Sequence, residues 1–350
     1  MDETPSTSPP AAGAAAAPHF ALAPGDAGAD PAAGPLLCGL ADSAVVEFAG
    51  EDATSFLQGQ FTADIAAMEV ESWQLCGYCT PRGRLLALFE LWRAGAGATE
   101  GYAARIPLGN AQDFLARIRR PILRARVRVE MATARWSLAG LLGSGAAALL
   151  AQAAMPVPDR PWRRLFAADG TSVARLPAGR LAQERFVLAG PAGAMSDWSR
   201  RLAAAREVSP ALWHWSGIEA AIPAIDAATR DAFVPQSVHL EVLGGVSFRK
   251  GCYPGQEVVA RSQYLGKLRR RMALAHAGVA PSSPDVFHDS EAREAVGRIV
   301  CSAESPAGGV DLLVEGPSRL FTEGVLRAGS RDAAPLVIQP LPYELFDPTA

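Results

Sequence analysis

Alternating apolar and polar positions in residues 36–130 predict β-strands interrupted by two amphipathic helices. In the first strand, Val46 and Phe48 alternate with Val45 and Glu47, which is the period-2 pattern of a strand with two different faces. Strands are predicted at residues 43–49, 73–80, 84–92, 101–107 and 123–130, and helices at residues 52–58 and 110–120. The order of strand, helix, three strands, helix and strand is typical of an antiparallel α+β sheet layered with helices.

The pattern is repeated more loosely in residues 131–267 and changes after residue 267. In the second part, strands are predicted at residues 135–142, 162–168, 173–176 and 185–188, and helices begin near Ser196 and Ser209. Residues 268–350 instead contain short apolar stretches separated by turns with Pro, Gly and Ser, which is typical of a small β-barrel. We therefore predict two α+β domains, residues 36–130 and 131–267, followed by a barrel.

Residues 1–35 are rich in Ala, Pro, Gly and Asp and contain few large aliphatic side chains. Such a stretch has too little apolar surface to offset the entropy lost on ordering it. The sequence therefore predicts a disordered tail whose removal leaves stability and ligand binding unchanged. The tail lacks the features of a secretory or transit peptide, and no later apolar run reaches the length of a membrane span.

Composition indicates a globular protein of a reducing compartment. The net charge of −3 argues against a general affinity for nucleic acids or membranes. Five cysteines, an odd number, argue against a disulfide framework and favour the cytoplasm. Arginines cluster in residues 117–128 and, with Lys267, in residues 261–271. Each cluster is either a solvated face or a positive surface for an anionic ligand tail or partner.

Residues 250–257, with the sequence Lys-Gly-Cys-Tyr-Pro-Gly-Gln-Glu, place a cation, a thiol, an aromatic ring and a carboxylate in one short loop. We predict a buried strand before it, at residues 242–248. A helix is predicted after it, at residues 254–265, because a proline suits the first helical turn. Cys252 would then lie near a helix N-terminus and near Lys250, and both favour a thiolate over a thiol.

The chain has 33 lysines and arginines, yet only Lys250 and Lys267 are lysines, and both flank this loop. An ammonium differs from a guanidinium in geometry and hydration, which favours a specific need for lysine at position 250 over chance. Gly251 and Gly255 are expected to permit a tight backbone path. The simpler alternatives are a buried turn cysteine and, for Glu257, a solvated helical turn.

Two further groups of residues have both a chemical and a structural interpretation. Cys76 and Cys79 have C-x-x-C spacing, but residues three apart on a strand face opposite sides, so no metal site is predicted. Trp213, with its neighbours His214 and Trp215, either packs in the core or stacks on a flat ligand ring.

Residues 250–257 resemble the signature loop of the YgfZ-type folate-binding proteins, which act in iron–sulfur cluster assembly and repair. The resemblance extends over about residues 36–345 and is also carried by residues 56–64, 79–84, 218–220, 233–236, 243–248, 264–267 and 340–343. The family is similar in fold to the aminomethyltransferase (T-protein) of the glycine cleavage system. The resemblance therefore implies two ferredoxin-like domains around a tetrahydrofolate pocket, followed by a C-terminal β-barrel.

The resemblance also implies roles for single residues. It implies a reactive pair, Cys252 and Lys250. It implies contacts with tetrahydrofolate, or a one-carbon derivative of it, at Trp213, Tyr253, Gln256 and Glu257. A second family tryptophan falls at Ser43. The catalytic aspartate of the T-proteins falls in the stretch that ends with Ala87 and Leu88. Apolar residues there cannot hold a proton for an amine leaving group, so aminomethyl transfer is not expected.

Three functions remain open from the sequence. The favoured one is a cytoplasmic tetrahydrofolate-binding accessory protein that supports iron–sulfur enzymes, such as radical-SAM tRNA-modifying enzymes. Its partners would be folate and iron–sulfur client or assembly proteins, with an indirect link to tRNA and none to membranes. The second is a folate-dependent one-carbon transferase or demethylase with Cys252 as nucleophile. The third is a factor that binds tRNA directly, although no RNA-binding motif is present. The Cys252 thiol could attack a one-carbon unit, ligate iron transiently or form a mixed disulfide.

Overall fold

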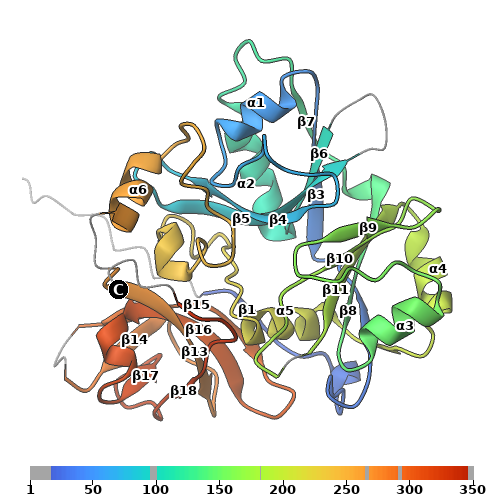
Figure 1. Cartoon of the computed structure of the whole chain (residues 1–350). Helices are drawn as coiled ribbons and strands as arrows, with labels where there is room; N and C mark the ends of the chain where they lie inside the picture. Colours follow the sequence, from blue (N-terminus) through green and yellow to red (C-terminus); the bar gives the residue numbers. More distant parts are fainter. Residues whose placement is uncertain (1–16, 95–100, 182, 265–267, 291–293, 346–350) are drawn as a thin grey trace, which may run out of the picture.

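The computed structural model describes residues 17–94, 101–181, 183–264, 268–290 and 294–345. Three β-sheets surround one helix, α5 (Pro210–Glu219), in a mixed α+β arrangement, as Figure 1 shows. The α+β class predicted from the sequence is confirmed. No helix within the described ranges is both long and apolar enough to cross a membrane.

The first sheet contains the strands predicted in the first part of the chain. Its order is β4-β5-β6-β3-β7 and its neighbouring strands are antiparallel. The elements are β3 (Ser43–Ala49), α1 (Ala53–Gln58), β4 (Trp73–Cys79), β5 (Leu85–Ala94), β6 (Gly101–Pro107), α2 (Leu108–Arg119) and β7 (Arg128–Met131). Alternation divides its side chains between two cores: Val46 and Phe48 pack with α1 and α2, whereas Val45 faces the centre of the molecule.

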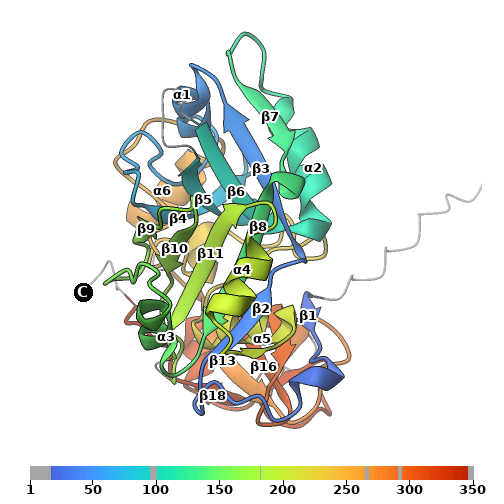
Figure 2. The same cartoon turned by 90° about the vertical axis from the view of Figure 1, so that its right-hand side faces the viewer.

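The second sheet has the order β12-β2-β8-β11-β10-β9. Its elements are β2 (Leu36–Gly39), β8 (Trp136–Leu142), α3 (Ala146–Gln152), β9 (Arg164–Phe166), β10 (Ser172–Arg175), β11 (Arg185–Pro191), α4 (Ala194–Arg201) and β12 (Arg206–Glu207). Strand β2 precedes the first sheet in sequence but pairs with β8. The first two sheets are therefore interleaved in sequence, and Figure 2 shows β2 running beside β8.

The third sheet has the order β17-β14-β15-β16-β13-β18. Its strands are β13 (Arg270–Ala277), β14 (Asp285–His288), β15 (Gly297–Glu304), β16 (Val310–Pro317), β17 (Leu326–Ala328) and β18 (Val337–Gln339). The residue before β18 reaches back to the opposite edge, because the amide of Leu336 donates to the carbonyl of Leu326 over 2.8 Å. The two ends of this strongly curved sheet are thus bridged.

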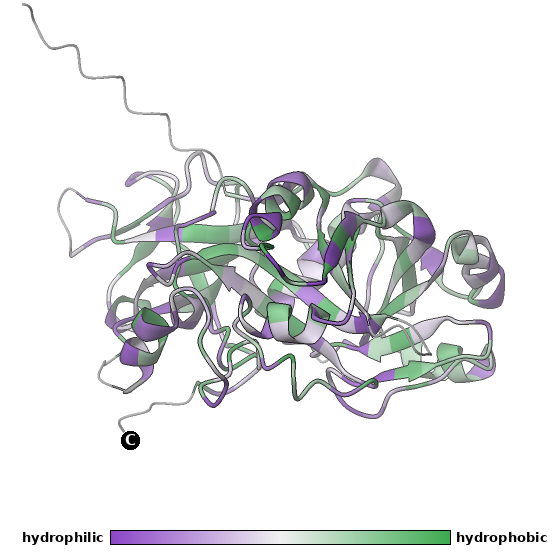
Figure 3. Ribbon diagram, turned by 90° about the horizontal axis from the view of Figure 1, so that it is seen from above, coloured by the Kyte–Doolittle hydropathy of each residue, from purple (hydrophilic) through white to green (hydrophobic). Residues whose placement is uncertain are grey.

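The inner faces of all three sheets contribute to one central hydrophobic core. This core contains Trp73 from the first sheet, Val187 from the second and Leu274 from the third, packed with Leu212 and Trp213 of α5. Helix α5 is capped at its N-terminus by Ser209, whose side chain accepts a hydrogen bond from the amide of Ala211. Figure 3 shows the hydrophobic residues concentrated along the strands, with hydrophilic residues on the outer helices and loops.

Two expectations from the sequence are wrong. Residues 242–248 form turns and irregular backbone, because Gly244 has a φ of +78° and Gly245 closes a turn onto the carbonyl of Leu240. Residues 17–35 are ordered rather than disordered: β1 (His19–Phe20) pairs in parallel with β15. Residues 1–16 of the expected tail lie outside the described residues.

Candidate functional site

A cavity of about 90 Å³ lies where the three sheets meet α5. Leu75, Leu88 and Ile218 contribute to its apolar wall. Its charged and aromatic groups come from different elements and converge on it: Glu90, Arg105, Arg185, Trp213, His214 and Phe20. A largely apolar cavity with a few convergent polar groups is the usual form of a small-molecule site.

Glu90 on β5 and Arg105 on β6 face each other and form a buried ion pair. Arg105 Nη2 lies 2.5 Å from Glu90 Oε1, and the indole of Trp73 donates to Glu90 Oε2 over 2.8 Å. Burial alone would lower the pKa of Arg105, but the Glu90 carboxylate outweighs it and raises that pKa. Arg105 also donates to Ser43 Oγ over 3.1 Å. The serine at the position of the second family tryptophan therefore helps to hold this ion pair.

Arg185 on β11 lies over the indole of Trp213, with its guanidinium carbon 4.8 Å from the ring centre. Its Nε donates to Ser216 Oγ over 2.9 Å. Burial lowers the pKa of Arg185 to about 10, so the side chain still carries its charge at pH 7. A Cβ on Gly140 of β8 would lie 2.3 Å from the indole. Trp213, only 2% exposed, is therefore packed in the core and lines the cavity as well.

His214 follows Trp213 on α5 and is held on two sides. Its Nε2 is hydrogen-bonded to the carboxylate of Asp42. Its ring stacks on that of Phe20, with centroids 3.7 Å apart and planes 8° from parallel. Burial would raise the pKa of Asp42, but the hydrogen bond and charge of His214 outweigh this effect and lower it. The cavity thus has an aromatic surface that is at present covered by a residue of β1.

Lys250 ties the signature loop, residues 250–257, to the first sheet. Its Nζ donates to the carbonyls of Phe61 and Ala63 over 2.6 and 2.9 Å and lies 5.1 Å from the ring centre of Tyr253. The side chain is buried, and burial lowers its pKa to about 8. These contacts give Lys250 a structural role, and its expected effect on the Cys252 thiol stays a prediction.

Three of the stretches that carry the family resemblance meet at this loop. Thr62, in the first of them, accepts a hydrogen bond from the amide of Gly77 over 2.8 Å and donates to the carbonyl of Gly245 over 2.5 Å. In the second, the β4–β5 turn passes so close to Gly255 that a Cβ on this glycine would lie 2.5 Å from the carbonyl oxygen of Thr80. The β4–β5 turn therefore packs against the signature loop at Gly255, and Thr62 holds the segment just before the loop at Gly245.

The other loop residues differ in exposure. Cys252 is an exposed free cysteine, whereas Tyr253 is buried and burial raises the pKa of its hydroxyl. Helix α6 (Gln256–Tyr264) follows the loop, close to the expected range. Gln256 donates to the carbonyl of Lys250 over 3.3 Å. Glu257 is 84% exposed and pairs with Arg261 one turn later, which is the geometry of a solvated helical turn.

The structure thus divides the residues expected to form one site. Trp213 lines the central cavity, and no residue of the signature loop does so in the described part of the chain. Gly255 has the expected positive φ, +83°, whereas Gly251 has open space around its Cα and an ordinary φ. Of the two glycines expected to permit a tight backbone path, only Gly255 therefore has a backbone conformation and close contacts that favour glycine.

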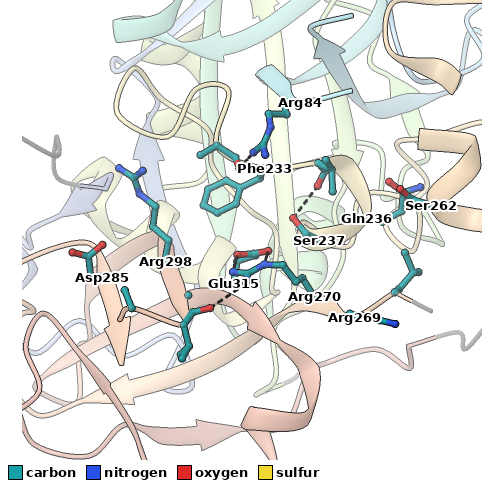
Figure 4. Close-up of a pocket in the computed structure, with 16 residues that line it drawn as sticks. Arg84, Phe233, Gln236, Ser237, Ser262, Arg269, Arg270, Asp285, Arg298 and Glu315 are labelled. Atoms are coloured by element: carbon teal, nitrogen blue, oxygen red, sulfur yellow. Dashed lines mark hydrogen bonds and ion pairs between the residues drawn. The ribbon is translucent and has the colours of Figure 1, made fainter. Parts of the chain in front are cut away.

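A second and larger cleft, of about 730 Å³, opens between α6 and the third sheet (Figure 4). Of the arginines that line it, Arg84 donates to the carbonyl of Ala232 over 2.6 Å, and Arg270 forms a bidentate pair with Glu315. The cleft has one aromatic side chain in its lining, Phe233, whereas several aromatic rings line the central cavity, namely Phe20, Phe89, Trp213 and His214. We therefore take the smaller cavity, with its convergent aromatic and charged groups, as the candidate ligand site.

The predicted basic clusters are largely neutralised. Arg271 is buried and pairs with Glu241, and Arg117 pairs with Asp113. Lys267 lies outside the described residues.

The C-x-x-C pair does not form a metal site. Cys76 packs in the core under α1 and α2, whereas Cys79 packs in the central core, so the two thiols face opposite sides as expected. Within the described ranges, no group of three or more His, Cys, Asp or Glu side chains could hold a metal ion.

Sequence reasoning missed four residues of the cavity: Glu90, Arg105, Arg185 and Phe20. The first three are charges in mostly apolar strands, a signal that marks a buried ion pair or a functional charge. Phe20 gave no such signal, because its stretch has no strand periodicity. Its position depends on contacts with residues far away in the sequence.

Comparisons with known proteins agree with the architecture. No family model matches the chain. In fold it is similar to the crystal structure of glycine cleavage system aminomethyltransferase T from Bartonella henselae, with a TM-score of 0.67 and 16% identity over 88% of this chain and 86% of that one. At this identity, the likeness concerns the fold alone.

The sequence identity to two other known proteins is about twice as high. The chain is 32% identical over 318 residues to the tRNA-modifying protein YgfZ of Serratia proteamaculans, covering 89% of this chain and 93% of that protein. It is 30% identical to the protein of the same name from Pectobacterium carotovorum, with the same coverage. The chain therefore belongs to the family of the tRNA-modifying protein YgfZ.

Proposed function

We propose that this protein binds tetrahydrofolate, or a one-carbon derivative of it, in the central cavity and acts as an accessory protein of iron–sulfur cluster assembly or repair. Its clients would include radical-SAM enzymes that modify tRNA, which agrees with the name of its relatives. The observation that carries the proposal is the convergence of Trp213, Arg185 and Arg105 on one cavity in a T-protein-like fold.

The chemistry of the cavity suits a folate. A pterin is flat and aromatic, and indole, imidazole and guanidinium groups stack on such rings. The ligand also carries carboxylates, for which arginine is the preferred partner. When bound, folate would supply a one-carbon unit or a reduced ring, while Trp213 and Arg185 would bind and orient it.

The strand orders support the finer reading of the fold as two ferredoxin-like domains and a barrel. In the first sheet, β7-β3-β6-β5 with α1 and α2 has the order of a split βαβ fold. In the second, β8, β11 and β10 take the corresponding places, with β2 as the outer strand. The bridge from Leu336 to Leu326 supports the barrel.

Cys252 is proposed as the reactive group that meets the client. Its thiol is exposed on a loop fixed by Lys250 and Gly255, so a partner can reach it without unfolding. Aminomethyl transfer of the T-protein type is not part of the proposal, because Ala87 and Leu88 are buried apolar residues and cannot hold a proton. A cytoplasmic location would keep the thiol reduced.

A titration of the purified protein and a complementation assay in cells test the proposal. Titration with tetrahydrofolate should give saturable binding, and Cys252→Ser should keep that binding but abolish support of iron–sulfur clients in a strain that lacks the protein. Arg249→Gln, a change at an exposed neighbour, should keep both. Full complementation by Cys252→Ser would refute the thiol role. Catalytic turnover of a one-carbon folate would instead favour the transferase alternative, and salt-dependent binding of bulk tRNA would favour direct RNA binding.

A further inference from the structure

The central cavity is too small for the ligand that its chemistry suits. Its volume is about 90 Å³, whereas pockets for drug-sized ligands span roughly 300–1,000 Å³. Something in its wall must therefore move before a folate can enter. Most wall residues lie on strands of the three sheets or on α5, but Phe20 lies on the two-residue strand β1.

Residues 17–23, here called the strap, are attached to the rest of the protein by few contacts. The amide of Ser302 donates to the carbonyl of Pro18 over 2.8 Å, and the side chains of Ser302 and His19 are hydrogen-bonded over 2.9 Å. The amide of Leu22 donates to Glu304 over 2.9 Å. Pro18 is buried, and Phe20 and Leu22 pack against the central core, but a segment held by so few hydrogen bonds opens at lower cost than the central strands.

The chain that follows the strap is anchored more firmly. Asp26 is buried and accepts hydrogen bonds from the amide and hydroxyl of Ser209, the N-cap of α5, over 2.8 and 2.5 Å. Arg206 donates to the carbonyls of Gly25 and Ala27, both over 2.9 Å. The strap can therefore detach while residues from Pro24 onwards stay in place.

Phe20 already occupies an aromatic position in the cavity wall. Its ring lies parallel to that of His214 at 3.7 Å, and the hydrogen bond to Asp42 fixes the His214 ring. If Phe20 leaves, His214 presents a free flat face beside Trp213. A flat heterocycle could stack on that face in the same geometry.

We propose that the strap is a displaceable cover of the central cavity, and that Phe20 holds, on His214, the place of a flat ring of the incoming folate. This inference rests on the proposed folate binding. Ligand and strap then compete for one surface, so the apparent affinity of the full chain is its intrinsic affinity reduced by the fraction of open molecules. His214 becomes a binding residue that the family motifs do not mark.

Three chains test the inference: the full-length protein, Phe20→Ala, and a deletion of residues 1–23. A deletion of residues 1–16 is the matched control, because it leaves the strap intact. Calorimetric titration with 5-formyltetrahydrofolate should show that Phe20→Ala and the 1–23 deletion bind roughly 5- to 30-fold more tightly than the full-length protein, the factor expected for loss of one modest contact. The control should bind like the full-length protein.

Hydrogen exchange of the unaltered full-length protein gives a second readout that needs no variant. Saturating 5-formyltetrahydrofolate should increase exchange in residues 18–22 while it protects α5. Equal or weaker binding by the strap variants, or a strap that becomes protected on ligand addition, would overturn the inference while leaving folate binding in place. If none of the chains binds, including the 1–23 deletion, the proposed function itself fails.

Discussion

Gly83 and Gly255 lie against each other, so that neither position has room for a side chain. A Cβ on Gly255 would lie 2.6 Å from the Cα of Gly83, and a Cβ on Gly83 would lie 2.9 Å from the Cβ of Val258. Both glycines also have positive φ values, +72° for Gly83 and +83° for Gly255. The turn of the first sheet and the signature loop are therefore joined by backbone packing, which explains why both segments need glycine.

Replacement of Gly255 should destabilise the protein, whereas replacement of Gly251 should not. Gly255→Ala places a methyl group 2.5 Å from the carbonyl oxygen of Thr80 and should cost roughly 1–3 kcal/mol. Nothing lies within 4 Å of a Cβ on Gly251, so Gly251→Ala should change the free energy of unfolding by less than about 0.5 kcal/mol. Urea denaturation measures both, and equal effects would contradict the assigned contacts.

Cys252 should be the fastest cysteine to react in the native protein. It is exposed, whereas the other four cysteines are buried. Burial raises the pKa of Cys38, Cys79 and Cys301 to about 12 and that of Cys76 further. Peptide mass spectrometry after brief iodoacetamide treatment at pH 7 should find the label on Cys252. Comparable labelling of a buried cysteine before unfolding would disagree with this packing.

Lys250 should make stability depend on pH above neutrality. Burial lowers the pKa of Lys250 to about 8 in the folded protein, from 10.5. Between these values the unfolded chain binds more protons than the folded chain, so the contribution of Lys250 to the free energy of unfolding rises with pH. The difference in this free energy between the unaltered protein and Lys250→Met should therefore grow from about pH 7.5 to about pH 10. A constant or falling difference would mean that the ammonium is not buried.

Trp213 should matter for stability as well as for ligand binding. Its indole is 2% exposed and packs against Gly140 and Arg185. Trp213→Ala should therefore lower the free energy of unfolding by about 3–5 kcal/mol. The milder Trp213→Phe keeps an aromatic ring, so a folded protein remains in which affinity can be measured. Unchanged stability in Trp213→Ala would show that the indole is not part of the core.

The sequence predicted those parts of the fold that local alternation determines. The opposite facing of Val45 and Val46, and the break between the strands predicted at residues 73–80 and 84–92, follow from strand periodicity. Contacts between distant residues were not predictable in this way. Phe20 is ordered by His214, and residues 242–248 are held as turns by the contact of Gly245 with Thr62.

For the candidate site, the sequence identified Trp213 and the exposed loop residue Cys252. It did not identify the ion pair that lines the cavity. The Glu90–Arg105 pair depends on the register of β5 and β6, which alternation alone does not fix. Likewise, the family motifs gave no sign that Lys250 points to Phe61 and Ala63. Both contacts depend on how segments that are distant in the sequence pack together.

Folate titration of two cavity-filling variants tests the central claim most directly. Ile222→Trp places a large ring in the wall of the central cavity, and Ser262→Trp does the same in the larger cleft beside α6. Calorimetry with 5-formyltetrahydrofolate should show one saturable site, weakened at least about tenfold in Ile222→Trp, a difference of ~1.4 kcal/mol, and unchanged in Ser262→Trp. Loss of binding in Ser262→Trp alone, or no binding by the unaltered protein and its strap deletion, would contradict the account.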